Sequence, residues 1–430
     1  MAETRPTEGQ KGYAVKDSVA EVDARVEVRS LLDTVVKDGA QRMLRAAIEE
    51  EVEAFLRGVG DVVDERGRRQ VVRNGHLPER TVLTGAGPLV VSQPRVRDRR
   101  GASDPEAVRF SSAILPPYLR RSRSLDELIP WLYLRGISTG DFQEALQALL
   151  GEGAAALSAT TITRITTPWE EEHASWGRRD LRGKEYVYMY ADGVHFNIRL
   201  TGERQCILVI LGVTPEGKKE LVGLREGYRE DKQSWLELLV DLRSRGLTKD
   251  PKLAAGDGAL GFWAALPEVY PSTRWQRCWV HKTANVLSKM PKSVQPRAKS
   301  GLHEIYMAES REKADKAFDL FIEQFGAKYP RAVECLEKDR EALLAFFDFP
   351  AEHWIHIRTT NAIESIFDTV RHRHRKTKGS GSRAACLTMV FKLVQAAEKK
   401  WRRLTGANHI LKLLAGYRYV DGIEQERNAA

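Results

Sequence analysis

Three acidic residues that lie far apart in the sequence, Asp192, Asp257 and Glu364, have the chemistry to hold divalent metal ions. Cutting a phosphodiester requires an in-line attack on a phosphorus atom that is surrounded by negative charge. Two Mg²⁺ ions, about 3.5–4 Å apart, activate the nucleophile and stabilise the leaving oxygen in such a reaction. Mg²⁺ takes one or two protein carboxylates and completes its shell with phosphate oxygens and water. Acids that converge from separate elements at one sheet edge therefore predict a phosphodiester-cleaving site with two Mg²⁺ or Mn²⁺ ions.

Asp192 stands at the end of a predicted strand in which Tyr186, Tyr188 and Tyr190 alternate with apolar residues. The alternation places Asp192 on the tyrosine face of that strand. However, Asp192-Gly193 between two strand-like segments is also a strong signal for a hairpin turn. Considered by itself, this position is explained better by a turn than by catalysis.

Asp257 follows a short apolar strand predicted at Lys252–Ala255. In α/β sheets the carboxyl ends of the strands are where ligands bind, which favours a functional role. The alternative is that Asp257 caps the helix predicted from Leu260 onward, or forms the turn before it.

Glu364 lies in the segment Thr359–Ser365, directly before a strongly basic run. In a structural interpretation, Asn361 caps a helix whose third residue is Glu364, a variant of the capping box, and the basic run is a solvated face. In a functional interpretation, an acid that binds metal lies beside cations that bind phosphate, as a nuclease site needs. The candidate phosphate contacts are Arg371, Arg373, Arg375, Lys376 and Lys378, together with Arg383.

The segments that must position these acids predict a mixed α/β sheet. Strands are expected before and after Asp192-Gly193, at residues 206–213 and at residues 219–224. An amphipathic helix from Ser234 to just before Gly246 then leads to the strand that precedes Asp257. From about residue 293 to residue 347 the pattern is helical, with Gly326 and Pro330 separating two long helices. We therefore expect an α/β core that is interrupted by an all-helical insertion.

The N-terminal part of the chain predicts a mostly helical region. Residues 1–25 are polar and lack periodicity, so we expect a disordered tail. Apolar residues recur at helical spacing over Val26–Leu56, and Gly58 and Gly60 end this pattern. Two strand-like segments, Arg80–Thr84 and residues 89–92, flank a glycine turn and predict a hairpin. Candidate DNA contacts in this arginine-rich segment are Arg73, Arg95 and Arg97.

Three further helices are predicted at residues 124–134, at residues 140–150 and from Ser158, the last of which carries Arg164. Short helices joined by tight glycine turns resemble a helix-turn-helix, with Arg164 as a candidate DNA contact. Plain helical packing explains the same pattern equally well.

Positive charge is concentrated in two regions of a chain whose net charge is +9. Residues 66–100 contain nine arginines against Glu79 and Asp98, and residues 351–430 contain 15 lysines and arginines against 7 acids. Such concentrations favour a polyanion, because each neutralised phosphate releases condensed counterions. Anionic lipids or solubility are the alternatives.

Several other classes of protein are disfavoured. The longest apolar stretch, Cys206–Val213, is too short to cross a bilayer, and Met1–Ser18 has no apolar signal core. The four cysteines show no repeated spacing, which fits a reducing compartment. No Gly-x-x-x-x-Gly-Lys-Ser/Thr loop is present, so nucleotide hydrolysis is not indicated. We expect a cytoplasmic, nucleoid-associated protein without a membrane partner or a nucleotide cofactor.

Four motifs around the three acids resemble the Mutator-type transposases of bacterial insertion sequences. They are Ala191–Phe196, Gly256–Phe262, Gln276–Asn285 and Thr359–Ser365. The likeness extends from the arginine-rich hairpin nearly to the C-terminus. Ala362 stands where many members of the family have proline, a difference that gives no reason to expect a displaced Glu364.

The resemblance implies a ribonuclease-H-like core in which Asp192, Asp257 and Glu364 form a DDE triad of metal ligands. It implies double-stranded DNA partners: the protein would bind terminal inverted repeats, free 3′-hydroxyls and join them to target DNA. Synapsis of two DNA ends implies a homodimer or a larger assembly. The expected organisation is a tail (1–25), a DNA-binding region (26–176), a catalytic core (177–292 and 351–415), a helical insertion (293–350) and a C-terminal tail (416–430).

Cys278 and His281 belong to one of the matching motifs. Cys-x-x-His resembles half of a zinc site, but no second pair follows at a suitable spacing, and structural zinc takes four ligands. The family carries this pair near its active site, which implies a structural or DNA-end-positioning role.

Two competing interpretations remain open at this stage. The first is a DNA-binding regulator without catalysis that is descended from a transposase, and the presence of all three acids argues against it. The second is a metal-dependent nuclease that hydrolyses DNA but never joins strands. Only the resemblance separates this nuclease from a transposase.

Overall fold

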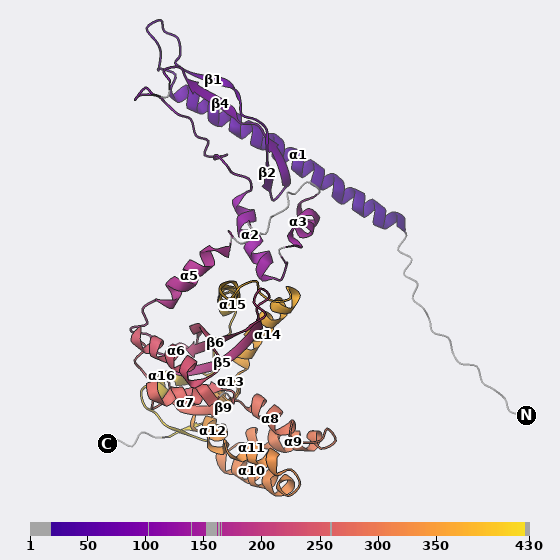
Figure 1. The fold of residues 1–430 in the computed structure, drawn as a ribbon, viewed down its shortest axis with the longest axis vertical. Helices are drawn as coiled ribbons and strands as arrows, with labels where there is room; N and C mark the ends of the chain where they lie inside the picture. Colours follow the sequence, from indigo (N-terminus) through magenta and orange to yellow (C-terminus); the bar gives the residue numbers. More distant parts are fainter. Residues whose placement is uncertain are drawn as a thin grey trace, which may run out of the picture. The chain divides into compact units, whose positions relative to one another are not determined.

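The computed structural model describes residues 19–425 except 102, 139, 152–160, 162, 163, 165 and 259 (Figure 1). The chain divides into two compact units. One comprises Met1–Trp131 and Thr139–Ile162, and the other comprises Leu132–Ser138 and Thr163–Ala430. Most of the helix predicted from Ser158 lies outside the described residues. No described helix combines the length and the apolar character that crossing a bilayer requires.

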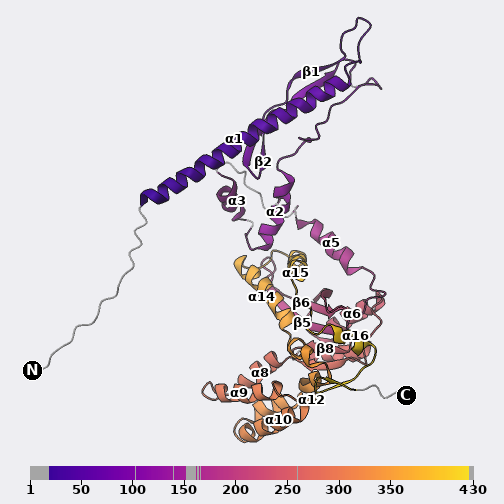
Figure 2. The ribbon, with the colours of Figure 1, turned by 180° about the vertical axis from the view of Figure 1, so that it is seen from behind.

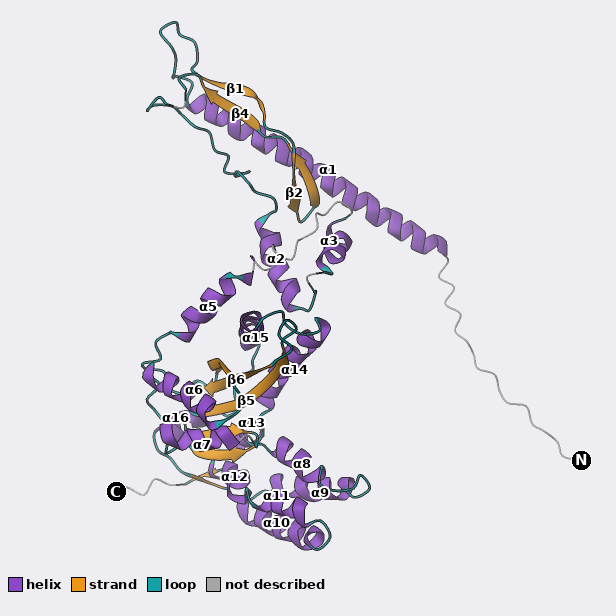
Figure 3. Cartoon of the chain, in the orientation of Figure 1, coloured by secondary structure: helices purple, strands orange, loops and turns teal. Residues whose placement is uncertain are grey.

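The first unit is built on one long helix, α1 (Val19–Gly58), along which two pairs of strands lie (Figure 3). The helix ends at Gly58 as expected, but it begins at Val19, so residues 19–25 are helical and not part of a disordered tail. Strands β2 (Arg80–Thr84) and β3 (Gly87–Val91) form the predicted hairpin, and β1 (Val71–His76) pairs antiparallel with β4 (Pro94–Asp98). Ile48 of α1 packs with Val82 and Val91 of the hairpin.

Two shorter helices follow the strands. Helix α2 (Arg123–Leu134) runs from the first unit into the second, and α3 (Phe142–Leu150) belongs to the first. Leu125 of α2 and Leu146 of α3 pack against Leu83 of the hairpin, so both helices share a core with the strands. These helices match two of the predicted ones.

The second unit contains a mixed five-stranded sheet with the order β7-β6-β5-β8-β9. Its strands are β5 (Tyr188–Asn197), β6 (Arg204–Val213), β7 (Lys219–Gly227), β8 (Leu253–Gly256) and β9 (Arg274–Arg277). Neighbouring strands among β5, β6 and β7 are antiparallel, whereas β8 runs parallel to β5 and β9 parallel to β8. The expected α/β class with a mixed sheet is therefore confirmed.

Strand β5 corrects one expectation about Asp192. The strand continues through Asp192-Gly193 without a turn, and Asp192 pairs with Val209 of β6. The dipeptide is therefore not a hairpin, and the two predicted strands around it are one. The chain reverses after Asn197, where β5 leads into β6.

Helices cover both faces of this sheet (Figure 2). On one face, α6 (Lys232–Ser244) and α7 (Leu260–Val269) contribute Trp235 and Phe262 to a core with Met189 and Ile210. On the other face, α14 (Asn361–Lys376) packs on β5, and α15 (Arg383–Glu398) packs on β7 and on α5 (Pro168–Gly177). Side chains alternate between the two faces along β5. Tyr188 and Tyr190 therefore pack in the core on the α14 face, whereas Met189 and Ala191 pack in the core on the α6 face.

The segment between the sheet and α14 is helical, as expected. Its helices are α8 (Trp279–Leu287), α9 (Gln295–Tyr306), α10 (Arg311–Gly326), α11 (Pro330–Glu337), α12 (Arg340–Leu344), η1 (Ala345–Asp348), η2 (Ala351–His353) and α13 (Trp354–Ile357). Gly326 and Pro330 separate α10 from α11. The part before Gly326 is two helices rather than one long one, because Ser310 caps a new helix by accepting a hydrogen bond from the Lys313 amide.

The C-terminal segment is folded further than expected. After α16 (Asn408–Leu414), strands β10 (Tyr419–Val420) and β11 (Ile423–Glu424) form a small antiparallel pair. The Asp421 carboxylate accepts a hydrogen bond from the Arg311 amide at 2.6 Å, and the Gly422 amide donates to the Phe347 carbonyl at 3.1 Å. Residues 419–424 are therefore held against the helical insertion and do not form a tail.

Candidate active site

Two of the predicted acids meet at one edge of the sheet, and a third acid that the sequence did not indicate joins them. Carboxylate oxygens of Asp192, Asp257 and Glu230 all lie within 4.8 Å of one another. Asp192 lies within β5, and Asp257 follows β8, which is paired with β5 in parallel through Ala191 and Gly256. Glu230 lies in the loop between β7 and α6. Three separate elements therefore bring these oxygens together.

Asp257 is positioned through its backbone. Its carbonyl oxygen accepts hydrogen bonds from Trp263 Nε1 and from the Arg277 guanidinium, both at 2.8 Å. The preceding residue, Gly256 of β8, lies so close to α7 that a Cβ there would lie 2.9 Å from the Trp263 ring. These contacts hold the start of the loop that carries the Asp257 carboxylate. The alternative role as a helix cap is not needed to explain its placement.

Glu230 occupies space that two glycines leave open. A Cβ on Gly193 would lie 2.6 Å from Glu230 Oε1 and closer still to its Cγ and Cδ. A Cβ on Gly261, in the first turn of α7, would lie 2.5 Å from the Asp231 carbonyl carbon. The glycine of Asp192-Gly193 thus serves a close approach rather than a turn. The sequence signal for Glu230 is an acid in the loop after a strand, directly before Asp231, which caps α6 by accepting a hydrogen bond from the Ser234 amide at 2.8 Å.

Burial and mutual repulsion shape the electrostatics of this site. Asp192 is 7% exposed. Burial, followed by the charge of Asp257, raises the pKa of Asp192 to about 7, and Glu230 adds to the effect. Burial and the charge of Asp257 also raise the pKa of Glu230. The protein therefore holds carboxylates together at the expense of their ionisation, which a bound cation would reverse.

Glu364 lies in a second group, with Cys278 and His281, whose ligand atoms are within 4.8 Å of one another. Glu364 Oε1 accepts a hydrogen bond from Thr360 Oγ1 at 2.7 Å and lies 3.6 Å from His281 Nδ1. A hydrogen bond with Cys278, and then the charges of Cys278, Glu364 and Asp257, raise the pKa of His281 to about 9. His281 is thus close enough to both groups to interact with each.

The start of α14 explains how Glu364 is held. Asn361 is the first residue of the helix and Thr360 is its N-cap, so the expected capping box with Asn361 is not formed. Instead, the buried Cys278 sulfur accepts a hydrogen bond from the Thr360 amide at 3.3 Å and lies 3.2 Å from Thr360 Oγ1, whose proton goes to Glu364. Cys278 therefore fixes the turn from which Glu364 projects.

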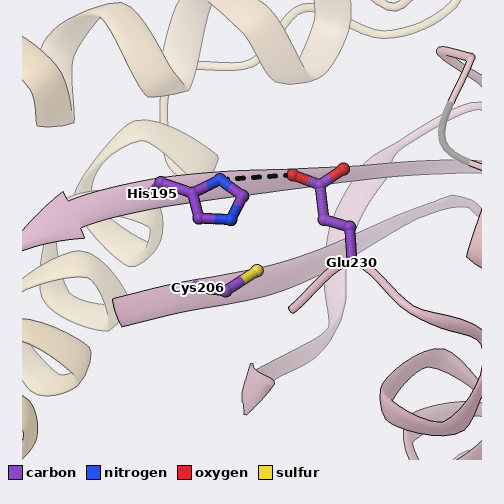
Figure 4. Close-up of side chains that lie close together, drawn as sticks. All are labelled: His195, Cys206 and Glu230. Atoms are coloured by element: carbon purple, nitrogen blue, oxygen red, sulfur yellow. Dashed lines mark ion pairs between the residues drawn. The ribbon is translucent and has the colours of Figure 1, made fainter. Parts of the chain in front are cut away.

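A third group shares Glu230 with the first. His195 of β5, Cys206 of β6 and Glu230 have ligand atoms within 4.8 Å of one another (Figure 4). His195 Nδ1 lies 3.4 Å from Glu230 Oε1. Cys206 is buried, and burial raises the pKa of its thiol to about 12.

One of the candidate phosphate contacts, Arg373, is corrected by the structure. Its side chain is 4% exposed, donates from Nε to the Tyr133 carbonyl at 3.1 Å, donates to Thr377 Oγ1, and lies over the Tyr133 ring. Burial lowers the pKa of Arg373. Because its guanidinium is occupied inside the protein, Arg373 holds α14 against residues 132–138 and is not available to DNA.

The remaining candidate phosphate contacts in and after α14 differ in whether their side chains are already paired within the protein. Arg371, Arg375, Lys376 and Lys378 are exposed. Arg371 lies 3.6 Å from Asp368. Arg383, in contrast, pairs with Glu203 at 2.7 Å and with Glu226. Arg383 therefore stabilises the contact between α15 and the sheet in addition to any role on DNA.

In the first unit the candidate arginines also fall into two kinds. Arg73 pairs with Glu49 at 2.7 Å and with Glu53 at 3.6 Å, both on α1. Arg95 and Arg97 are exposed along β4. Arg164, in the second unit, is exposed as well.

Comparison with known proteins gives a consistent result. The sequence model described as "Transposase, Mutator family" matches residues 13–404. The transposase for insertion sequence element IS6120 of Mycolicibacterium smegmatis is 50% identical over 303 residues, 70% of this chain and 93% of that protein. The transposase for insertion sequence element IST2 of Acidithiobacillus ferrooxidans is 53% identical over 288 residues, 65% of this chain and 95% of that protein.

Among solved structures, a chain in the simian T-cell lymphotropic virus intasome in complex with PP2A regulatory subunit B56 gamma was found. The match has 13% identity and a TM-score of 0.17, and it covers 50% of this chain and 65% of that chain. A likeness this weak carries no argument about the fold.

Proposed function

The chain belongs to the Mutator family of transposases, and on this premise we propose that it is a DDE-type enzyme that cuts and rejoins the DNA of an insertion sequence. Family membership confirms the resemblance inferred from the sequence motifs. The observation that carries the proposed chemistry is the convergence of Asp192 and Asp257 from neighbouring parallel strands, with Glu364 in the adjoining group.

We further propose that the catalytic core is ribonuclease-H-like. Three antiparallel strands followed by two strands parallel to the first, in the order β7-β6-β5-β8-β9, support this assignment. The placement of Asp192 within the first strand and of Asp257 directly after β8 supports it as well.

The family implies a divalent metal, and the donor set of this site fits one. Oxygen donors from carboxylates suit Mg²⁺ and Mn²⁺. Asp192 is buried, and the charge of His281 offsets only part of the effect of burial and of Asp257, which together raise the pKa of Asp192. Asp192, Asp257 and Glu364 would hold two such ions, which when bound supply an activated nucleophile and stabilise the oxygen that leaves phosphorus.

The residues of the chain have distinct tasks in this proposal. Trp263 and Arg277 keep Asp257 in place, and Cys278 with Thr360 keeps Glu364 in place. The burial of Asp192 lowers the local dielectric, which strengthens its attraction for a cation. The exposed cations Arg371, Arg375, Lys376 and Lys378 would bind backbone phosphates, as would Arg95, Arg97 and Arg164.

The DNA partners are the terminal inverted repeats of the element and the target DNA. Because two ends must be held together for joining, we propose that the protein acts as a homodimer or a larger assembly. Light scattering of the protein with and without inverted-repeat DNA tests this proposal, and a single protomer on one DNA end would contradict it.

The decisive experiment is a cleavage and joining assay. The protein is incubated with Mg²⁺, labelled duplexes that carry the inverted repeats flanking its gene, and a target plasmid. We expect nicked ends and joined products with the wild-type protein and neither with Asp192→Asn, although that variant should still bind the duplex. Nicks without joined products would indicate a nuclease, and binding without either product would indicate a regulator. Full cleavage by Asp192→Asn would remove Asp192 from the mechanism.

A further inference from the structure

We propose that Glu230 is a further carboxylate ligand of the metal centre that contains Asp192 and Asp257, an inference that rests on the proposed function. The position of its carboxylate is the first argument. Oxygens of Glu230, Asp192 and Asp257 lie within 4.8 Å of one another, whereas Glu364 lies in the group with Cys278 and His281. In this structure, Glu230 completes a set of three oxygen donors around one point.

The second argument is that the surrounding backbone is shaped around Glu230. Side-chain atoms of Glu230 fill the volume that a Cβ on Gly193 would take, directly after Asp192 in β5. The Glu230 carbonyl and the Asp231 backbone lie against Gly261, in the first turn of the helix that follows Asp257. The loop that carries Glu230 is therefore seated between the two elements that carry Asp192 and Asp257, so its carboxylate is held at the site by packing.

The third argument concerns charge. Among the described residues, Glu230 has an ion pair with His195, 3.4 Å from Nδ1 to Oε1, and none with a lysine or an arginine. The charge of His281 acts on both Asp192 and Glu230, but this single charge faces Asp257 and Glu364 as well. A divalent cation bound by oxygens of all three acids would supply the missing positive charge. His195 would orient the Glu230 carboxylate, as outer residues orient ligands in other metal sites.

Glu230 also belongs to a second group of candidate metal ligands. With His195 and Cys206 it offers nitrogen, sulfur and oxygen donors, a set that suits Zn²⁺ rather than Mg²⁺ (Figure 4). We favour the oxygen-only centre because the carboxylate oxygens of Asp192 and Asp257 both lie within 4.8 Å of a Glu230 oxygen. The two arrangements predict different effects on metal binding when Cys206 is replaced.

Mn²⁺ binding to the full-length, DNA-free protein tests the inference without relying on catalysis. Free Mn²⁺ is measured by electron paramagnetic resonance during titration. We expect Glu230→Gln and Asp192→Asn each to weaken Mn²⁺ binding by roughly tenfold to a hundredfold, the loss typical when a supporting group of a metal site is removed. Glu237→Gln is the matched control, because Glu237 pairs with Arg225 on the surface and should leave the affinity unchanged.

Each outcome decides a specific point. Wild-type Mn²⁺ affinity in Glu230→Gln, together with a loss in Asp192→Asn, would overturn the role of Glu230 and leave the proposed function intact. Wild-type affinity in both variants would overturn the metal centre itself. Should Glu230→Gln fail to fold, Glu230→Asp keeps the charge but withdraws the carboxylate, and it is expected to bind Mn²⁺ more weakly than the wild-type protein.

The role of Cys206 is tested with Co²⁺. A sulfur-to-Co²⁺ charge-transfer band that disappears in both Cys206→Ser and Glu230→Gln, while Mn²⁺ binding persists in both, would assign Glu230 to the His195/Cys206 group and contradict the inference. Cys278→Ser controls for the thiol near Glu364. We expect Cys206→Ser to retain wild-type Mn²⁺ affinity.

Discussion

Replacing Asp192 by asparagine is expected to stabilise the metal-free protein while it abolishes DNA cleavage. Asp192 lies in β5 with 7% of its surface exposed, and its Oδ1 accepts a hydrogen bond from the Gly193 amide at 2.9 Å. An asparagine oxygen can accept the same bond. What the substitution removes is a buried charge that burial and Asp257 disfavour.

The pKa of Asp192 gives the size of the effect. Burial and the charge of Asp257 raise that pKa from 3.8 to about 7. Each unit of pKa difference between the folded and unfolded states corresponds to about 1.4 kcal/mol, so ionising Asp192 costs the folded state about 4 kcal/mol. Because the folded pKa is the higher one, the stability is fully present below about pH 4 and is lost as the pH rises to about 7. Asparagine does not ionise and escapes this loss.

Chemical unfolding in EDTA, followed by tryptophan fluorescence, measures the difference. Trp235, Trp263 and Trp279 are buried in the unit that contains the site and report on its unfolding. At pH 8 we expect Asp192→Asn to exceed the wild-type protein by a few kcal/mol, and at pH 5 by less than half as much. Addition of Mg²⁺ should stabilise the wild-type protein more than the variant.

Asp368→Asn is the control variant for this experiment. Asp368 is exposed, so Asp368→Asn should change the free energy of unfolding little at either pH. If Asp192→Asn is no more stable than the wild-type protein at pH 8 without metal, the burial of an ionised Asp192 does not destabilise the folded protein.

Three other predictions concern DNA, packing and metal. Replacing Arg371 and Arg375 together by alanine should weaken binding to all DNA sequences and flatten the dependence of affinity on salt, measured by fluorescence anisotropy; Arg373→Ala should instead lower the melting temperature, because its guanidinium binds Tyr133 and Thr377. Gly193→Ala should lower the cleavage rate more than tenfold by displacing Glu230, whereas Gly212→Ala, which would clash with Tyr186 and Val222 in the core, should act mainly on the melting temperature. EDTA should abolish nicked and joined products, and Mg²⁺ or Mn²⁺ should restore both; cleavage in EDTA would contradict a metal-dependent mechanism.

The elements of the core could be predicted from the sequence because their periodicity is strong. The apolar run Cys206–Val213 forms all of β6 except its first two residues, and the helix predicted from Ser234 to just before Gly246 forms α6 within a few residues. Local sequence patterns give a wrong prediction where a residue type is required by a contact with a residue that is distant in the sequence. Asp192-Gly193 has the composition of a turn, yet its glycine makes room for Glu230, which is remote in sequence. Short-range statistics carry no information about such a neighbour.

The burial of Arg373, in contrast, follows from the helical periodicity of its own segment. Ile366, Val370 and Arg373 follow one another at spacings of four and three residues, and all three are buried on one face of α14. A basic run on an amphipathic helix must place some of its cations on the buried face. Exposed cations for DNA were therefore to be expected at Arg371 and Arg375 and an internal partner at Arg373, which proves to be the carbonyl and ring of Tyr133.

Glu230 could not be predicted as a site residue from the sequence, for a physical reason that also bears on how the site binds metal. An isolated acid before a capping aspartate has an ordinary structural explanation, and its proximity to Asp192 exists only once β7, β5 and α7 have packed. Packing holds the three carboxylates within 4.8 Å at a cost in stability, because burial and repulsion raise the pKa values of Asp192 and Glu230. Stability that is given up to hold such groups is recovered when a cation binds, which couples metal affinity to the folded geometry. A substitution that relieves the repulsion should therefore increase the free energy of unfolding of the metal-free protein and lower the affinity of the site for metal at the same time.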